Sequence, residues 1–549
     1  MCEPLILQSD MTILFEVNTP LFESVRSRLS SFSELEKSPE YIHTYRITPV
    51  SVWNAASSGI PLKDIEIFLQ RRCRYELPRN VLFTLRDLYS RFGKLVLTRQ
   101  GERLLLESSD PVILQEARSN KRIGPFMLEA PSETSVFINS AYRGHLKREF
   151  IEIGFPVRDE AGYTAGTPFA FALKDGFFSL RDYQTAAVEA FYEGGADTGG
   201  SGTVVLPCGA GKTIVGMGVM SCYQCQTLIL TTNIVALRQW RRELIDKTDI
   251  DPESIGEYSG EKKEVRPITI ATYNIATYRK DKEADFEHFG LFSENNWGLI
   301  VYDEVHLLPA PVFRVTAGLQ ARRRLGLTAT LIREDGLETD VFSLIGPRKY
   351  DMPWKELENR AWIARALCHE FRIAMDRELR LRYISGGERE KFRLASENSA
   401  KEEVVAELLV KHSKDNVLVI GQFIKQLESL AERFRAPIIT GSTPTAEREQ
   451  LYARFRKGET PVLVVSRVAN FGIDLPDANV AIQVSGTFGS RQEEAQRLGR
   501  ILRPKQGANT AFFYTLVTRG SKEQQYASNR QRFLTEQGYA YTMENWGEG

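Results

Sequence analysis

The chain has no net charge, because its 71 lysines and arginines balance 71 aspartates and glutamates. Net charge therefore argues neither for nor against a nucleic-acid partner, and any basic binding surface must be local. No apolar run approaches the roughly 18 residues of a membrane span, and Met1-Cys2-Glu3 does not begin a signal peptide. We expect no membrane association and a cytoplasmic location, or a nuclear one if the source has a nucleus.

Cysteine is scarce, with six residues at positions 2, 73, 208, 222, 225 and 368. Scattered thiols are typical of a reducing compartment. Cys222 and Cys225 form one C-x-x-C pair, but no second pair completes a four-ligand zinc site, and too few cysteines cluster to hold an iron–sulfur cluster. We interpret both as small apolar residues of a helix.

The length of 549 residues is too great for one hydrophobic core. A prior of about 150 residues per domain suggests three or four domains. We expect a first module at 1–128, a small α+β unit at 129–178, and two larger domains at 179–365 and 366–549.

The first module has the pattern of a winged helix. Its turn and capping residues predict three helices followed by a hairpin around Gln100-Gly101, with the helices at 50–56, 61–73 and 78–92. Eight arginines between positions 71 and 103 suit a DNA-backbone face. Interleaved acidic residues leave a solvated face or a protein-docking module equally open.

From about residue 179 the chain alternates apolar strands with helices, which predicts parallel sheets with crossover helices. Strands of the first half are expected at 203–206, 227–231, 268–271, 299–302 and 324–327, and those of the second half at 417–420, 438–440, 462–465, 480–484 and 511–515. The fold class is therefore α/β, with two doubly wound parallel-sheet domains. The carboxyl end of strand 203–206 is the expected ligand site.

That strand runs into the stretch LPCGAGKT (residues 206–213), which has the pattern of a phosphate-binding loop. Glycines let backbone N–H groups surround a polyphosphate, and the following helix adds its positive N-terminus. Leu206 stands where the full pattern has its first glycine. We expect the loop to hold ATP, with Lys212 on the outer phosphates and Thr213 on magnesium, through Pro207, Gly209, Ala210, Gly211, Lys212 and Thr213.

Strand 299–302 ends in two carboxylates, at the position where a phosphate-loop ATPase holds its metal. We expect Asp303 to bind Mg²⁺ and Glu304 to orient and deprotonate the attacking water. His306 would couple this site to the neighbouring domain, and the hydroxyls of Thr328 and Thr330 would relay the nucleotide state.

Upstream of the loop, Gln184 has an amide that can pair with the edge of adenine, so it is the candidate for selecting ATP, with Arg181 beside it. In the second half, Gly472, Asp474 and Gln496 are the candidate nucleotide contacts. Arg500 and Arg503 are three residues apart and so are expected on one helix face, from which they would reach across a cleft. Such an arginine is worth about 10³ to 10⁵ in rate in other phosphoryl-transfer enzymes.

Taken together, these motifs resemble a superfamily-two helicase. The matching stretches are FSLRDYQ (178–184), LPCGAGKT (206–213), DEVH (303–306), GLTAT (326–330), FGIDLP (471–476) and QRLGRILR (496–503). The segment Arg333-Glu334-Asp335 after LTATLI, with LIGP (344–347) and QRFL (531–534), is similar to the XPB/Ssl2/Rad25 branch. The chain lacks the longer extensions expected of eukaryotic members.

This resemblance implies two tandem RecA-like domains and a 3′-to-5′ DNA helicase or duplex translocase that uses ATP and acts in DNA repair. Arg333, Glu334 and Asp335 would act in duplex opening, and 129–178 would be a damage-recognition-like unit. The thumb-like insertion of the family would be represented by 377–393. We expect a monomeric motor on duplex DNA with a single-stranded region, with a nuclease or other repair protein as partner.

Two other functions remain open at this point. One is an ATP-gated platform that stays on DNA and recruits a nuclease or polymerase without unwinding, and the other is an RNA helicase, which the Arg-Glu-Asp segment disfavours. Further surfaces proposed for phosphate tracking are Thr232-Asn233 with Arg238, Thr272-Tyr273 and Ser466-Arg467.

Overall fold

The computed structural model describes residues 3–29, 31–37, 41–101, 103–139, 142–161, 166–174, 179–195, 199–276, 278, 288, 291, 295–307, 323–329, 341, 344–466, 478–486, 491–502 and 509–547. Within these ranges, no helix is long and apolar enough to cross a membrane. The chain divides into two compact units. Unit 1 comprises Met1–Glu34, Tyr41–Leu206 and Gly211–Met352, and unit 2 comprises Leu35–Glu40, Pro207–Ala210 and Pro353–Gly549.

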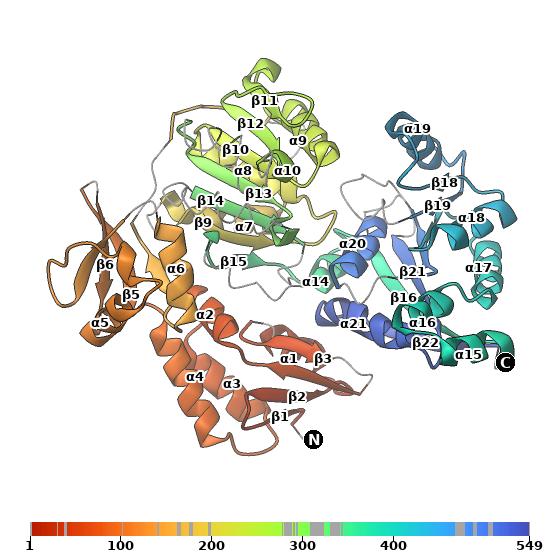
Figure 1. Ribbon diagram of the computed structural model, residues 1–549, viewed down its shortest axis with the longest axis horizontal. Coiled ribbons are helices and arrows are strands. Elements are labelled where there is room, and N and C mark those ends of the chain that lie inside the picture. The colour runs from red at the N-terminus through yellow and green to blue at the C-terminus, as the bar shows by residue number, and fades with distance from the viewer. Residues whose placement is uncertain are drawn as a thin grey trace. The chain divides into compact units, whose positions relative to one another are not determined.

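The amino-terminal module combines an antiparallel sheet of order β1-β2-β4-β3 with four helices (Figure 1). The three predicted helices are present, and Thr48 caps the first of them through its side chain. The sequence patterns did not predict α1, β3 or β4. The elements are β1 (Leu5–Leu7), β2 (Thr12–Glu16), α1 (Phe22–Leu29), β3 (Glu34–Lys37), β4 (Ile42–Arg46), α2 (Pro49–Ser57), α3 (Leu62–Arg72) and α4 (Arg79–Arg91).

The predicted hairpin is present, and its strands also pair with strands that follow it in the chain. Its two strands lie in the middle of a second sheet of order β7-β6-β5-β8, which crosses residue 128. Their leucines pack with Val136, Ile138 and Val157 in one buried cluster, so burial joins the hairpin to the small unit. We therefore propose that the boundary between the amino-terminal module and the small unit lies between α4 and β5. The elements are β5 (Leu95–Gln100), β6 (Arg103–Ser108), α5 (Pro111–Ser119), β7 (Ser135–Ile138), α6 (Arg143–Glu152) and β8 (Val157–Asp159).

The first large sheet has seven parallel strands in the order β11-β12-β10-β13-β14-β9-β15. Its central strands are buried along almost their whole length, as expected of parallel strands with helices on both faces. All five predicted strands are confirmed. The elements are α7 (Asp182–Tyr192), β9 (Ser201–Val205), α8 (Lys212–Tyr223), β10 (Thr227–Thr231), α9 (Ile234–Lys247), β11 (Ile255–Tyr258), β12 (Ile268–Thr272), α10 (Tyr273–Ala276), β13 (Leu299–Asp303), β14 (Arg323–Thr328) and β15 (Arg348–Asp351).

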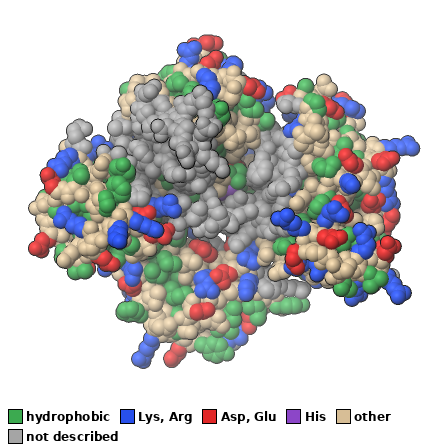
Figure 2. Space-filling model, viewed as in Figure 1, with side chains coloured by type: hydrophobic (Ala, Val, Ile, Leu, Met, Phe, Trp, Pro, Cys, Tyr) green, Lys and Arg blue, Asp and Glu red, His purple; other side chains and the backbone are tan. Residues whose placement is uncertain are grey.

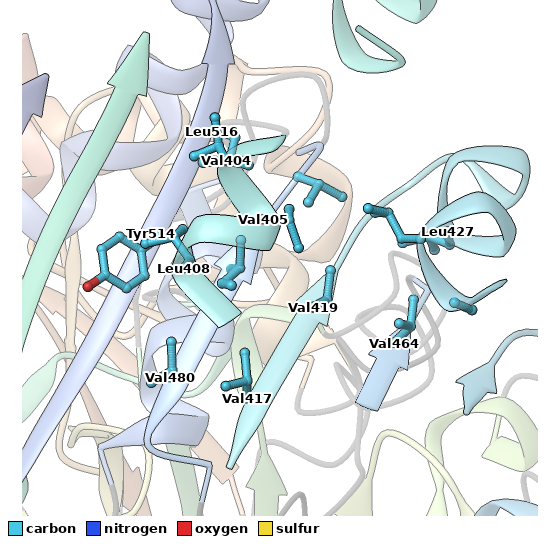
Figure 3. Close-up of a cluster of buried hydrophobic side chains, with 14 of the residues drawn as sticks. Val404, Val405, Leu408, Val417, Val419, Leu427, Val464, Val480, Tyr514 and Leu516 are labelled. Carbon is cyan, nitrogen blue, oxygen red and sulfur yellow. The ribbon is translucent and has the colours of Figure 1, made fainter. Parts of the chain in front are cut away.

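Unit 2 contains a second parallel sheet of seven strands in the order β18-β19-β17-β20-β21-β16-β22. Valines and leucines of α17, β17, β19 and β20 fill its core together with Tyr514 (Figure 3). The five predicted strands are confirmed, and the longest segment of the unit starts at Pro353, 13 residues before the expected boundary at 366. The elements are α14 (Trp354–Asn359), β16 (Arg365–Ile373), α15 (Arg377–Ser385), α16 (Glu388–Ser396), α17 (Ala400–Lys411), β17 (Val417–Ile420), α18 (Ile424–Arg433), β18 (Ile438–Ile439), α19 (Thr445–Arg456), β19 (Val462–Val465), β20 (Val480–Gln483), α20 (Arg491–Ile501), β21 (Thr510–Thr518), α21 (Lys522–Glu536) and β22 (Tyr541–Trp546).

Charged side chains of both signs are interspersed over the face drawn in Figure 2, which agrees with the balanced composition. The segment considered for a thumb consists of the short helices α15 and α16, and α15 has no buried residue. The same helix, α15, exposes Leu381 and Ile384 in addition to carrying arginines.

Candidate active site

The glycine-bearing loop leaves β9 and enters α8 through two left-handed residues. Gly209 and Gly211 both have φ of +80°, a conformation that costs a residue with a Cβ atom but not glycine. The Leu206 N–H donates to the carbonyl of Thr328 at 3.0 Å and so ties the start of the loop to the end of β14. Lys212 and Thr213 are the first residues of α8, where unpaired N–H groups and the helix dipole favour an anion.

Gln184 lies directly against this loop. A Cβ atom at Gly211 would be 2.6 Å from Nε2 of Gln184, so the glycine leaves room for the amide. The side chain is buried, and its Oε1 accepts the backbone N–H of Arg181 at 3.0 Å, which fixes its orientation at the start of α7. Arg181 donates from Nη1 to the hydroxyl of Tyr183 at 3.3 Å.

The two carboxylates follow β13 at the same edge of the sheet. Because β13, β14 and β9 are neighbours, the ends of these three strands meet beside the loop. Glu304 has φ of +51°, a strained conformation for a residue with a side chain, and such strain concentrates at functional sites. Asp303 is held twice: Trp240 Nε1 donates to Oδ2 at 3.0 Å, and the Tyr273 hydroxyl donates to the backbone carbonyl at 2.8 Å.

Lys212 and His306 lie on either side of the Glu304 carboxylate. Lys212 Nζ is 3.4 Å from Oε1, and His306 Nδ1 is 3.5 Å from Oε2. His306 Nδ1 is also 2.6 Å from the Thr328 hydroxyl, so one buried ring joins Glu304 to the end of β14. The structure therefore places four of the predicted residues in one connected group within unit 1.

Electrostatics separate the two carboxyl groups. Burial raises the pKa of Asp303 to about 6, and the adjacent Glu304 charge adds to the rise. Burial acts in the same direction on Glu304, but the charges of Lys212 and His306 outweigh it, so the pKa of Glu304 is below its usual value. Glu304 is therefore the carboxylate that stays ionised as the pH falls.

This group suits a small divalent cation. Asp303 and Thr213 offer carboxylate and hydroxyl oxygens, the donors that Mg²⁺ prefers. Two adjacent carboxyl groups in a buried setting favour the approach of a positive charge. Oε2 of Glu304 is buried and lacks a hydrogen-bond partner among the described residues, so part of the acceptor capacity of this carboxylate is unused within them.

Comparison with known proteins identifies the family. The chain is 50% identical over 541 residues to the "DNA 3'-5' helicase XPB" of Kineococcus radiotolerans, covering 98% of this chain and 96% of that protein. It is 49% identical over 543 residues to the protein of the same name from Mycobacterium tuberculosis, covering 99% and 98%. The chain belongs to the XPB family.

Less similar members of the XPB family also match nearly the whole length of this chain. A subunit from Enterocytozoon bieneusi named "General transcription and DNA repair factor IIH helicase/translocase subunit XPB" is 32% identical over 564 residues, covering 98% of this chain and 92% of that one. Three family models match separate segments. Residues 5–131 match a helicase conserved C-terminal domain, 177–333 the res subunit of a type III restriction enzyme, and 357–545 the ERCC3/RAD25/XPB C-terminal helicase.

Several predicted site residues are not described by the structure. These are Thr330, Arg333, Glu334, Asp335, Gly472, Asp474 and Arg503, together with the side chains of Gln496 and Arg500. The helix α20 carries Arg500 in its last turn and ends at Ile501.

Two aromatic residues have a place in this site that the sequence patterns did not predict. Tyr273 was expected at a DNA surface, but it is 2% exposed and bonds to Asp303. Trp240 was not singled out, although its spacing from Leu237 and Leu244 predicts a buried face of α9. Of the other proposed DNA contacts, Ser466 is buried, and Arg238 is exposed and paired with Glu261.

Proposed function

We propose that this chain is an ATP-dependent 3′-to-5′ DNA helicase of the XPB type, with a role in DNA repair in the cytoplasm of a prokaryotic cell. The observation that carries the proposal is the arrangement of Lys212, Asp303 and Glu304 at the carboxyl edge of the first sheet. Membership of the XPB family and the names of its members support the polarity and the choice of DNA over RNA.

ATP would bind with its phosphates in the loop between β9 and α8. The N–H groups at the start of α8 would donate to phosphate oxygens, and Lys212 would turn from Glu304 to the outer phosphates. Gln184, already fixed by Arg181, is the proposed contact for adenine. Gly472, Asp474 and Gln496 remain proposed contacts from the second RecA-like domain.

Glu304 is the proposed general base. Its carboxylate stays ionised, and departure of Lys212 to the phosphates would free Oε1 to orient the attacking water. Mg²⁺, held by Asp303 and Thr213, would neutralise charge on the phosphates. We propose that Arg500 and Arg503 add positive charge during phosphoryl transfer.

The signal from the nucleotide would pass through His306 to Thr328. This hydrogen bond of 2.6 Å is a direct path from Glu304 to β14, which continues toward Thr330 and the Arg333-Glu334-Asp335 segment proposed for duplex opening. DNA contacts would be mainly to phosphates and so independent of base sequence.

A strand-displacement assay tests the function. Duplexes with a 3′ tail, a 5′ tail or an RNA strand are incubated with the purified chain and MgATP, with Lys212→Ala as the inactive control. We expect displacement of the 3′-tailed DNA alone. DNA-stimulated ATP hydrolysis without any displacement would contradict the helicase proposal and favour the ATP-gated platform, and displacement of RNA would contradict the proposed substrate.

A further inference from the structure

Trp240 contacts the proposed metal-binding carboxylate from a separate helix. It lies on the buried face of α9 with 1% of its surface exposed, and its indole N–H donates to Oδ2 of Asp303 at 3.0 Å. The indole is a donor only, so this bond has one possible direction. A tryptophan used merely to fill a core needs no carboxylate as its acceptor.

Gly216 makes this reach possible. The glycine lies within α8, where it is less favourable than alanine. A Cβ atom there would lie 2.6 Å from Cη2 and 3.4 Å from Cζ3 of Trp240, and 3.3 Å from Leu327 Cδ1. The absent side chain therefore gives the indole its path beside the phosphate-loop helix to Asp303.

Asp303 is held at its main chain as well. Tyr273, at the end of β12, donates to the Asp303 carbonyl at 2.8 Å. Trp240 follows β10, and β10 pairs with both β12 and β13. Two aromatic donors, one from α9 and one directly after β12, thus fix the carboxylate and the backbone of the same residue.

We propose that Trp240 is a positioning residue that orients the Asp303 carboxylate toward the divalent cation bound with the nucleotide. Hydrogen-bonded partners of metal ligands commonly set the direction of the ligand oxygen and the affinity for the metal. This inference rests on the proposed ATPase function, and it adds a residue outside the motifs that predicted the site.

The test measures Mg²⁺ affinity without relying on turnover. A fluorescent ADP analogue is titrated into the full chain in EDTA and over a series of Mg²⁺ concentrations. For Trp240→Phe, which keeps an aromatic ring and removes the donor, we expect the half-saturating Mg²⁺ concentration to rise about 10- to 100-fold. Binding of the analogue in EDTA should equal that of the wild type.

Trp297→Phe is the matched control. Trp297 is also fully buried in unit 1, and its Nε1 donates to the carbonyl of Leu291 at 2.8 Å, so the same substitution removes an equivalent hydrogen bond away from Asp303. We expect its Mg²⁺ requirement to match the wild type. An equal rise in both variants would overturn the proposal, because general loosening of unit 1 would then account for it.

A second variant covers a failure of Trp240→Phe to fold. Gly216→Ala keeps the indole but must displace it, so it should raise the Mg²⁺ requirement in the same direction. If the wild type shows no Mg²⁺-dependent ADP binding, the proposed function itself fails. If the wild type shows it and both variants keep the wild-type requirement, only the role of Trp240 is overturned.

Discussion

Lys212 and Lys401 both stand in the first turn of a helix, and each faces a glutamate from another element. In unit 2, Lys401 donates to both oxygens of Glu523 at 2.8 and 2.9 Å and to the Val484 carbonyl, with both side chains at most 1% exposed. The Thr518 N–H also donates to Glu523.

The pair in unit 1 is much less complete. Lys212 and Glu304 are 11% and 22% exposed, approach only to 3.4 Å, and leave Glu304 Oε2 buried without a hydrogen bond among the described residues. A buried ion pair that only stabilises a fold needs all its donors and acceptors satisfied. The pair whose carboxylate keeps an acceptor oxygen without a hydrogen bond in the described part of the chain is the one suited to exchange its partner for a phosphate or a water.

The largest expected effect is on catalysis in the incomplete pair. Glu304→Gln keeps the shape of the side chain but removes the base, so kcat for ATP hydrolysis should fall about 10²- to 10⁴-fold. A phosphate-release assay measures this, with circular dichroism to check the fold. Glu388→Gln, in an exposed ion pair with Lys522, is the control. Wild-type turnover in Glu304→Gln would remove its role as base.

Disrupting the Lys401–Glu523 pair should lower the free energy of unfolding. Glu523→Gln leaves Lys401 buried without its counter-charge, and we expect unit 2 to lose about 3–5 kcal/mol of unfolding free energy. Glu388→Gln should cost less than about 1 kcal/mol, because its pair is exposed to solvent. Hydrogen exchange of α17, recorded over a series of urea concentrations, measures both losses of unfolding free energy. Equal losses would show that burial does not distinguish the two pairs.

The third prediction concerns His43, a buried titratable side chain of β4 in the amino-terminal module. Burial, with the nearby charge of Arg26, lowers the pKa of His43 from its usual 6.5 to about 4. The folded module therefore favours neutral His43, and its stability is retained above pH 6.5 and lost as the pH falls toward 4. Between pH 7 and pH 5 the loss should be about 2 kcal/mol.

Hydrogen exchange of β4 at the two pH values measures this loss, because separate units need not unfold together. His43→Phe retains an aromatic ring among Phe15, Phe22 and Tyr45 and should remove most of the pH dependence. An unchanged pH dependence in that variant would assign it to other groups.

The smallest expected effect lies at the edge of the incomplete pair. Thr328→Val removes the hydroxyl that bonds to His306, a loss worth roughly 1 kcal/mol. We expect a several-fold lower DNA-stimulated ATPase rate, whereas Thr328→Ser, which keeps the hydroxyl, should retain the wild-type rate. Equal rates in the two variants would argue against a signal through His306.

Local patterns predicted most elements because their causes are local. Apolar runs followed by turn residues mark β9, β10 and β13, and the motif spacing predicted that Lys212 and Glu304 lie together. Four strands of the two large sheets were missed, namely β11, β15, β16 and β22, since polar or charged residues interrupt the apolar residues of each. The hairpin was found, but the pairing of its strands with β7 and β8 was not predicted, because hairpin patterns do not specify which third strand will pair.

The sequence by itself determined the two parallel sheets, the phosphate loop and the acid pair, because strand period, glycine conformation and charge act over a few residues. Only the tertiary structure decided that Trp240 and Tyr273 hold Asp303 and that His306 bonds to Thr328. These contacts join residues 22 to 63 positions apart. They depend on the order of strands in the sheet, which no local pattern encodes.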